Sequence, residues 1–318
     1  MEDHQAIAAS IFARHGVDFA TVQRAGGWTN AVWLADRLVL RLSTDTENDN
    51  LLREARLAAL LPLAVGYPTL VEAGRTEGFA WTLATRLPGR SLGEVWADLR
   101  WEERVTALRG LWERAEAVHS VPAASASTIA PSRAWFNSAD AEETEASLAR
   151  LTNDGILAVT ESRVLRDALG RFWNALSTAP HVLCHGDLTL DNAVWHAGRV
   201  IALLDFEFAV MAPVQLDLNH LVKCAFGPED AAYAPSTTDL RGTQQLHRAV
   251  EELASPILAQ PGGRDLLMGY GMLLELWLLE LWLAHPDGEG PLAQWEPFRR
   301  LRSLSDGTGG YLAPLICG

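Results

Sequence analysis

The chain has 318 residues, of which 48% are hydrophobic and 21% are charged, so it is long enough for one large or two ordinary domains and too apolar to be disordered. Its 40 acidic side chains against 26 basic ones give a net charge of −14, which argues against nucleic acid or an anionic membrane as a partner, because phosphate groups bind basic surfaces. The same charge fits a cationic small molecule, and it also fits ordinary solubility.

The cysteine and lysine content narrows the chemistry further. Cys184, Cys224 and Cys317 are widely spaced without a C-x-x-C pair, which argues against a disulfide framework or a zinc ribbon and favours a reducing compartment. The acidic start of the chain does not resemble a secretory signal, so we expect a cytoplasmic protein. Lys223 is the only lysine and lies in an apolar stretch rather than after glycines, which excludes a Walker phosphate loop.

The first quarter of the chain alternates short apolar segments with turns. This pattern predicts five strands and, between the third and the fourth strand, a helix over residues 51–61. We expect the strands at residues 22–24, 31–34, 38–42, 69–73 and 79–86. Pro88 and Gly89 then interrupt any regular element. We therefore place a small mixed lobe at residues 1–87 and a larger, mainly helical lobe at residues 88–318.

Most of the second part has the apolar period of helices. Helices are expected at residues 101–119 and 139–151. The longest apolar run, residues 266–284, contains Glu275 and Glu280, so it is predicted to be a buried helix rather than a membrane span. Glu275 is then either a buried partner of an arginine or a contact of a substrate. The tryptophans of this run are expected to be core residues.

Residues 181–209 interrupt the helical pattern, and they contain the side chains that can carry a reaction. Residues 193–195 and 200–204 are predicted to form a hairpin, with Asn192 before its first strand and Asp205 after its second. These two positions end up roughly opposite one another, within about 5–8 Å. They direct two oxygen ligands to one point beside the loop that carries Asp187. Ligation by oxygen alone favours Mg²⁺, which keeps water and phosphate oxygens in its remaining positions.

The pattern His185-Gly186-Asp187-x-x-x-x-Asn192, with Asp205 in Leu-Leu-Asp-Phe-Glu, resembles the catalytic signature of the aminoglycoside phosphotransferase family. These proteins are small-molecule kinases built on the protein-kinase fold. The resemblance implies a two-lobed α+β fold, with a small β-rich N-lobe that covers the nucleotide. The larger, mainly helical C-lobe would carry the catalytic groups and bind the acceptor.

Segments earlier in the chain stand in the order of that family. The sequence Gly-Gly-Trp-Thr-Asn at residues 26–30 resembles the nucleotide-covering loop, and residues 38–42 resemble the third strand. Glu54 resembles the acid of the following helix, and residues 82–89 resemble the linker between the lobes. The resemblance therefore implies that eight residues bind the nucleotide. They are Gly26, Gly27, Thr29, Asn30, Arg41, Glu54, Thr82 and Ala84.

The resemblance also implies roles for the residues of the signature. Asp187 would accept the proton of the substrate hydroxyl, and Asn192 and Asp205 would hold Mg²⁺ against the phosphates of ATP, with GTP as the alternative nucleotide. Phosphoryl transfer depends mostly on positioning and charge neutralisation, so few groups are needed. His185 is expected to have a structural role, and Asp217 resembles the buried acid that supports the catalytic loop.

One position departs from the family pattern, because Arg41 stands where many kinases have a lysine in the third strand. Arginine keeps the positive charge and can bind phosphate through two nitrogens. Its planar guanidinium group nevertheless differs in shape from the ammonium group of lysine, so the two residues are not interchangeable. We expect Arg41 to pair with Glu54. Glu207 has three open roles, as a neighbour of the metal, a contact of the substrate or the partner of an arginine.

The sequence as a whole predicts an ATP- and Mg²⁺-dependent kinase that phosphorylates a hydroxyl of a small molecule, with an aminoglycoside-like or other antibiotic as the leading acceptor. The resemblance implies an acceptor cleft lined by helices at residues 139–151, 219–226 and 266–284. We expect a monomer or homodimer, with neither nucleic acid nor a membrane as partner.

Three alternatives remain open. The first is a metabolic kinase of the same fold, with an amino alcohol, a sugar or a macrolide as acceptor. The second is a nucleotide-binding protein without transferase activity, which the arginine at position 41 leaves open. The third is a two-metal phosphoesterase that uses His185, Asp187 and Asn192. Such an enzyme needs further histidine ligands, and the nearest candidate in the sequence is Asn219-His220.

Overall fold

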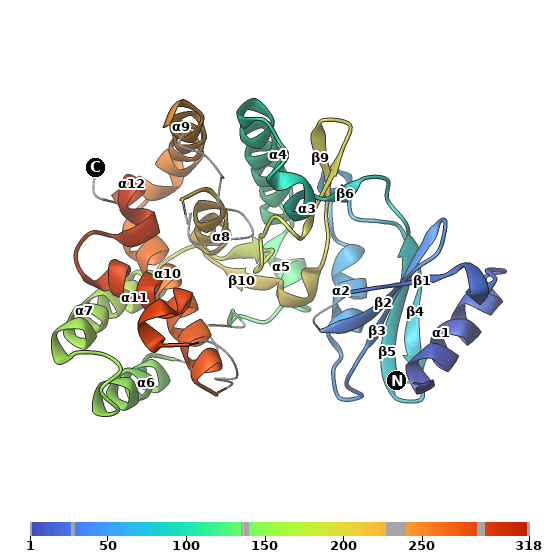
Figure 1. The fold of residues 1–318 in the computed structure, drawn as a ribbon, viewed down its shortest axis with the longest axis horizontal. Helices are drawn as coiled ribbons and strands as arrows, with labels where there is room; N and C mark the ends of the chain where they lie inside the picture. The colour runs from blue at the N-terminus through green and yellow to red at the C-terminus, as the bar shows by residue number, and fades with distance from the viewer. Residues whose placement is uncertain are drawn as a thin grey trace.

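Two lobes make up the molecule, and the division follows the change of pattern along the chain (Figure 1). The computed structural model describes residues 2–26, 29–134, 136, 140–226, 240–284 and 290–316. The strands of the first lobe are β1 (Gln23–Ala25), β2 (Asn30–Leu34), β3 (Leu38–Ser43), β4 (Leu70–Thr76) and β5 (Phe79–Thr85), and its helices are α1 (Glu2–Arg14) and α2 (Asn50–Ala58). The predicted strands and the predicted helix are all present, with ends that differ by a few residues.

The strands of the first lobe form one antiparallel sheet in the order β1-β2-β3-β5-β4. The two faces of this sheet have different neighbours, because successive side chains of a strand point to opposite faces. One face packs against α1, and its buried residues are Ala31, Trp33, Leu40, Leu42, Trp81 and Leu83. The residues between them in sequence face the second lobe. They are Val32, Leu34, Val39, Arg41, Thr82 and Ala84. Because side chains alternate along the strands, one face of the sheet forms the core of the first lobe and the other face forms one wall of a cavity.

Helix α1 is absent from the sequence-based expectations. Four of its seven apolar residues are alanines, whose small side chains mark an apolar face only weakly. Ile7, Ile11 and Phe12 are nevertheless buried against the sheet. The helix is stabilised mainly by this packing, as is usual for short helices in proteins.

The second lobe is mainly helical and contains two small sheets. Its helices are α3 (Leu92–Trp96), α4 (Trp101–His119), α5 (Ala123–Ala126), α6 (Ala141–Asn153), α7 (Val159–Leu176), α8 (Gln215–Phe226), α9 (Leu240–Leu258), α10 (Gly263–Ala284), α11 (Glu296–Ser305) and α12 (Ala313–Ile316). Its strands are β6 (Arg90–Ser91), β7 (Val182–Cys184), β8 (Ala193–His196), β9 (Arg199–Leu203) and β10 (Val210–Ala212). Helix α7 was not predicted, because the exposed Val159 and Val164 blur its apolar stripe.

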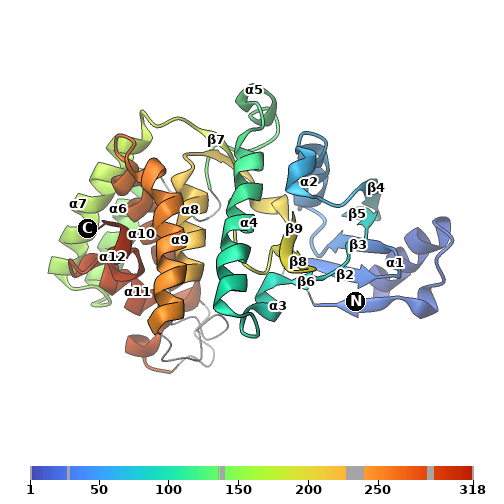
Figure 2. The same cartoon turned by 90° about the horizontal axis from the view of Figure 1, so that it is seen from above.

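The predicted hairpin is present as β8 and β9, which lie between α4 and the sheet of the first lobe (Figure 2). The first strand is one residue longer than expected, the second is shifted by one residue toward the turn, and the turn consists of Ala197 and Gly198 alone. Both residues have positive φ, 49° and 79°, which is the conformation of the two-residue turns that suit the twist of a hairpin. The hairpin starts directly after Asn192 and ends two residues before Asp205.

Helix α10 is the central helix of the second lobe and packs against α7, α8 and α11. By length and composition it could cross a membrane, but 61% of its most apolar window is buried inside the protein. This agrees with the prediction of a buried helix. Trp277 and Trp282 are partly buried and pack against the core.

Glu275 is fully buried in α10 and faces two cations from neighbouring helices. Lys223 Nζ of α8 lies 2.8 Å from its Oε1, and Arg300 Nη1 of α11 lies 3.9 Å from its Oε2. Glu275 is therefore a buried ion-pair partner, the first of the two roles that the sequence left open. Its partners are the only lysine of the chain and an arginine.

Removing this carboxylate should destabilise the protein strongly. In Glu275→Ala, Lys223 loses its counter-ion and Arg300 loses one of its carboxylate partners. We expect the free energy of unfolding to fall by about 3–5 kcal/mol, since an unpaired buried charge is costly. Urea unfolding followed by circular dichroism measures this change. Glu280 is the matched control, because it lies on the same helix and pairs with the exposed Arg150, so Glu280→Ala should cost less than about 1 kcal/mol. Equal losses in both variants would contradict the assignment.

Candidate active site

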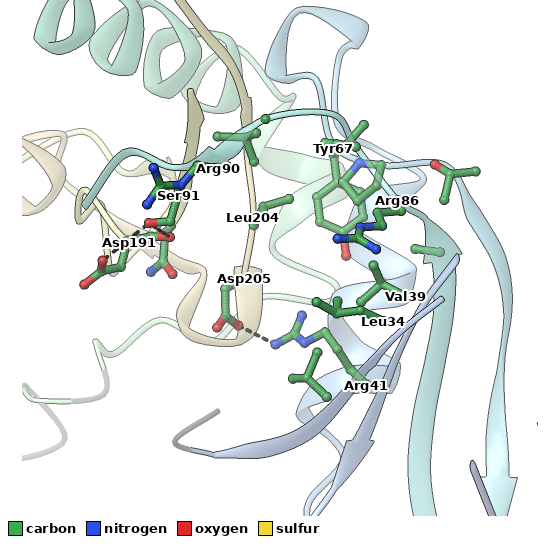
Figure 3. A pocket seen from close by; sticks show the side chains of 18 of the residues that line it. Leu34, Val39, Arg41, Tyr67, Arg86, Arg90, Ser91, Asp191, Leu204 and Asp205 are labelled. Atoms are coloured by element: carbon green, nitrogen blue, oxygen red, sulfur yellow. Dashed lines mark hydrogen bonds and ion pairs between the residues drawn. The ribbon is translucent and has the colours of Figure 1, made fainter. Parts of the chain in front are cut away.

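A cavity of 490 Å³ lies between the sheet of the first lobe and the β8–β9 hairpin (Figure 3). Apolar side chains line it from both sides. Val32, Leu34, Val39 and Ala84 come from the sheet, and Val194 and Leu204 come from the hairpin. Its polar groups include Arg41, Asn192 and Asp205. A cavity with two apolar walls and a charged end fits a flat aromatic ring joined to an anionic group.

Arg41 links the two lobes at this charged end. Its Nη1 donates to both carboxylate oxygens of Glu54, at 2.8 and 2.7 Å, and its Nη2 donates to Asp205 Oδ1 at 2.6 Å. The expected pair with Glu54 is therefore present. Burial by itself would lower the pKa of Arg41, but the charges of Glu54 and Asp205 outweigh it and raise the pKa above its ordinary value. Arg41 thus stays charged. Glu54 has a second partner, because the hydroxyl of Tyr67 donates to its Oε1 at 2.8 Å.

Asp217, fully buried near the start of α8, supports the loop that follows β7. Its carboxylate accepts the backbone N–H of His185 at 2.8 Å and that of Gly186 at 2.9 Å, and His119 Nε2 lies 2.9 Å from Oδ2. Burial would raise the pKa of Asp217, but the hydrogen bond and the charge of His119, together with the backbone N–H of Gly186, lower it overall. Asp217 therefore remains an anion that holds two consecutive backbone amides in place.

Gly186 can only be a glycine in this loop. Its φ is +82°, and a Cβ atom would lie 2.1 Å from the carbonyl oxygen of Phe208. Any side chain would both strain the backbone and clash with the segment after Asp205. The glycine of the His-Gly-Asp motif thus allows close packing of the two segments that carry Asp187 and Asp205.

His185 is buried and connects the loop to the end of β9. Its Nε2 lies 2.8 Å from the carbonyl oxygen of Leu204, which can only accept, so Nε2 carries the proton. Its Nδ1 then accepts the backbone N–H of Asp187 at 3.3 Å. The ring also packs against Phe206, with 4.6 Å between the ring centroids. Both ring nitrogens are therefore occupied, which agrees with a structural role.

Asn192 orients the carboxylate of Asp187. Its amide Nδ2 donates to the carbonyl oxygen of Asp187 at 2.9 Å and to Asp187 Oδ2 at 2.8 Å. The two donors of the amide group are thereby engaged, and its Oδ1 is the oxygen that can face a cation. The carbonyl of Asn192 accepts the N–H of Leu204 at 2.8 Å, which extends the hairpin ladder to the residue before Asp205.

Asp205 has a left-handed backbone conformation, with φ 62° and ψ 66°. Such a conformation is uncommon outside glycine and is best tolerated by aspartate and asparagine. Asp205 and Asn192 line the same cavity, and together they offer oxygen ligands only. This donor set fits Mg²⁺.

Only some of the other expected nucleotide-binding residues line the cavity. Glu54, Thr82 and Ala84 line the cavity. Gly26 is exposed after β1 and is not among the residues that line the cavity, and Gly27 lies outside the described residues.

Thr29 and Asn30 do not line the cavity either, and their side chains donate hydrogen bonds to Glu207. The sequence did not indicate these two partners of Glu207. Burial and the neighbouring Asp205 carboxylate raise the pKa of Glu207, and the hydrogen bonds from Thr29 and Asn30 partly offset the effect.

Tyr67 and His119 are polar partners that the sequence did not indicate. Tyr67 follows α2 without any motif around it, and His119 ends α4, 98 residues before Asp217. No spacing rule connects residues so far apart, so only the fold could identify them.

The phosphoesterase alternative is not supported by the described geometry. Both ring nitrogens of His185 are engaged within the protein, and Asn219 Oδ1 accepts the hydroxyl of Tyr311 at 2.9 Å. His119, Cys184 and Asp217 do lie within 4.8 Å of one another. Both carboxylate oxygens of Asp217 already accept backbone N–H groups, however, and the Cys184 thiol donates to the carbonyl oxygen of Ala212 at 3.5 Å.

The lowered pKa of Asp217 predicts how stability depends on pH. A carboxyl group whose folded pKa lies below its unfolded value contributes stability above the unfolded pKa, and this contribution is lost as pH falls through the folded pKa. We therefore expect Asp217→Asn to be less stable at neutral pH. From about pH 5 to about pH 3, its free energy of unfolding should fall less steeply than that of the wild type. Urea unfolding at each pH measures both slopes, and parallel slopes would contradict this role.

Comparisons with known proteins show the family and the fold of this chain. A sequence model of the phosphotransferase enzyme family matches residues 21–253, whereas a search of curated proteins finds no match. The GDP complex of aminoglycoside 2'-phosphotransferase-IIIa is 17% identical over 95% of this chain and 98% of its own, with a TM-score of 0.68. ADP-bound aminoglycoside phosphotransferase APH(2'')-Ib is 10% identical over 96% and 98%, with a TM-score of 0.63. The apo form of a thermostable mutant of APH(4)-Ia is 17% identical over 94% and 99%, with a TM-score of 0.62.

Proposed function

The chain belongs to the phosphotransferase enzyme family, and from that premise we propose that it transfers the terminal phosphoryl group of ATP, in the presence of Mg²⁺, to a hydroxyl group of a small molecule. One observation carries the proposal. Asp187, Asn192 and Asp205 come together beside a cavity whose apolar walls belong to different lobes. In this proposal the lobes are residues 1–87 and 88–318.

Each of these residues has a proposed task. Asp187 orients the acceptor hydroxyl and accepts its proton, and Asn192 keeps that carboxylate in position through its amide. Asn192 Oδ1 and the Asp205 carboxylate would hold Mg²⁺, which neutralises phosphate charge when it is bound. Arg41 supplies a fixed positive charge at the phosphate end of the cavity, because Glu54 holds it from the opposite side.

The nucleotide is proposed to lie with its base between the apolar walls. Val32, Leu34 and Ala84 face Val194 and Leu204 there, which suits a purine ring. ATP is the proposed donor, and GTP is the alternative. Solved relatives support a purine nucleotide in general, since they include a GDP complex and an ADP complex.

An amine-bearing antibiotic is the proposed acceptor. Two observations support this class. The chain has a net charge of −14, and solved structures of the same fold include complexes with kanamycin and with hygromycin B. A metabolic acceptor, such as an amino alcohol or a sugar, is the alternative. The cytoplasmic location and the oligomeric state stay predictions.

The test is a screen for phosphoryl transfer. Purified protein is incubated with ATP and Mg²⁺ and with aminoglycosides, macrolides, amino alcohols and sugars in turn, and ADP formation is measured by a coupled assay. The product is then identified by mass spectrometry as a phosphate ester of the acceptor. Chelation of Mg²⁺ should abolish the activity. Binding of nucleotide without transfer to any acceptor would favour a non-transferring nucleotide-binding protein, and absence of nucleotide binding would overturn the proposal.

A further inference from the structure

Glu207 connects the second lobe to the start of β2 in the first. It lies in the short 3₁₀ turn Phe206–Phe208 that follows Asp205, and only 2% of its surface is exposed. Its Oε1 accepts the hydroxyl of Thr29 at 2.6 Å, and its Oε2 accepts the amide Nδ2 of Asn30 at 3.2 Å. These donors precede Glu207 by 178 and 177 residues.

The turn that contains Glu207 is held by the first lobe at further points. Arg53 of α2 donates a short hydrogen bond to the carbonyl oxygen of Glu207. Arg41 of β3 binds Asp205, two residues earlier. Residues 205–207 are thus joined to the start of β2, to β3 and to α2 through side chains of the first lobe. The turn and residues 29–30 are therefore linked by direct hydrogen bonds.

Burying the Glu207 carboxylate close to that of Asp205 costs free energy unless the Glu207 oxygens have hydrogen-bond partners. Burying a charge requires compensation by hydrogen bonds or opposite charge. Thr29 and Asn30 supply two hydrogen bonds, and hydrogen bonds to a charged acceptor are stronger than neutral ones. An apolar residue at position 207 could fill the same space without this cost, so the carboxylate serves the connection rather than the packing.

We propose that Glu207 is a positioning residue that fixes Thr29 and Asn30, at the start of β2, to the segment that carries Asp205. The inference rests on the proposed function, because it assumes that residues 29–30 contribute to nucleotide binding. Glu207 acts through Thr29 and Asn30 and does not itself bind the phosphates. Nucleotide affinity then depends on a carboxylate that holds these two residues in place.

A double-mutant cycle between Thr29 and Glu207 tests the proposal. Thr29→Val removes the hydroxyl and keeps the shape of the side chain, and Glu207→Gln removes the charge. Isothermal titration with ADP and Mg²⁺ measures nucleotide affinity without any acceptor. We expect each single variant to bind ADP about tenfold more weakly. The double variant should also bind about tenfold more weakly, because both changes remove the same contact. Losses that multiply to about a hundredfold would show independent roles and overturn the proposal.

The magnesium dependence separates this role from direct metal binding. If Glu207 positions residues 29–30, the Mg²⁺ concentration for half-maximal ADP binding stays close to the wild-type value in both single variants. If Glu207 is instead a metal ligand, that concentration rises in Glu207→Gln and not in Thr29→Val, and the proposal is wrong. Glu102→Gln, an exposed change on α4, is the matched control for loss of one carboxylate and should bind ADP normally.

Two outcomes distinguish the inference from the proposed function. If the wild-type protein does not bind ADP with Mg²⁺, the proposed function fails. If the wild type binds and the two changes act independently, only the role of Glu207 fails. Should Glu207→Gln not fold, Thr29→Val and Asn30→Ala provide the cycle instead. Both donate to the same carboxylate, and their joint removal should then weaken binding more than either change alone.

Discussion

Replacing Asp187 by asparagine should lower the rate of phosphoryl transfer by about 10²–10⁴-fold and leave nucleotide affinity close to that of the wild type. The amide keeps the size of the carboxylate but cannot accept the proton of the acceptor hydroxyl. Asp187 is not among the residues that line the nucleotide cavity, so removal of its charge should leave the walls of that cavity unchanged. Single-turnover assays with the best acceptor of the screen measure the rate, and titration with ADP measures the affinity.

The control for this change is Asp167→Asn, a loss of one carboxylate from the exposed face of α7. It should transfer phosphate at the wild-type rate. A wild-type rate in Asp187→Asn would remove Asp187 from its proposed role. A large loss of nucleotide affinity would indicate that Asp187 acts mainly through the metal site.

The second large effect is expected for Arg41→Met, which breaks the connection between Glu54 and Asp205. Glu54 is only 1% exposed and would keep Tyr67 as a donor but lose its counter-charge. We expect the free energy of unfolding to fall by about 3–5 kcal/mol, because removing one partner leaves a buried charge without compensation. Nucleotide affinity should fall by about tenfold or more, since a charge-assisted contact to phosphate is lost.

A double variant separates the two consequences. In Arg41→Met with Glu54→Gln, the buried residue 54 no longer carries an unpaired charge, and only the partly exposed Asp205 remains without its arginine, so much of the lost stability should return. Nucleotide affinity should stay low, because the positive charge at the phosphate end of the cavity is still missing. Unfolding in urea and titration with ADP measure the two quantities independently. Unchanged affinity in Arg41→Met would mean that Arg41 serves only the structure of the strand.

Arg41→Lys tests whether the arginine is required in this form. The guanidinium group reaches Glu54 with one nitrogen and Asp205 with another, at 2.7 and 2.6 Å. An ammonium group is a single point charge and cannot reproduce this fork. We expect stability and nucleotide affinity between those of the wild type and Arg41→Met.

The shared place of Asn192 and Asp205 at one cavity could be predicted because it is a local property. The two residues flank one short hairpin, and the register of a hairpin follows from its turn and its alternating strands. The division of the first sheet into a core face and a cavity face follows from the same alternation. Arg41 and Glu54 are 13 residues apart on consecutive elements, and the resemblance to the phosphotransferase family indicated that pair as well.

The contacts that only the tertiary structure decided join residues far apart in the chain. Examples are Glu207 with Thr29, His119 with Asp217, and Glu275 with Lys223 and Arg300. Each pairs groups on different elements, and the partner is chosen by how helices and strands pack rather than by any spacing along the sequence. The sequence shows which polar residues, such as Glu275, lie within apolar segments, and an unpaired charge there would be too costly to bury. It therefore indicates that such a residue has a partner. Which residue is the partner depends on how the helices and strands pack.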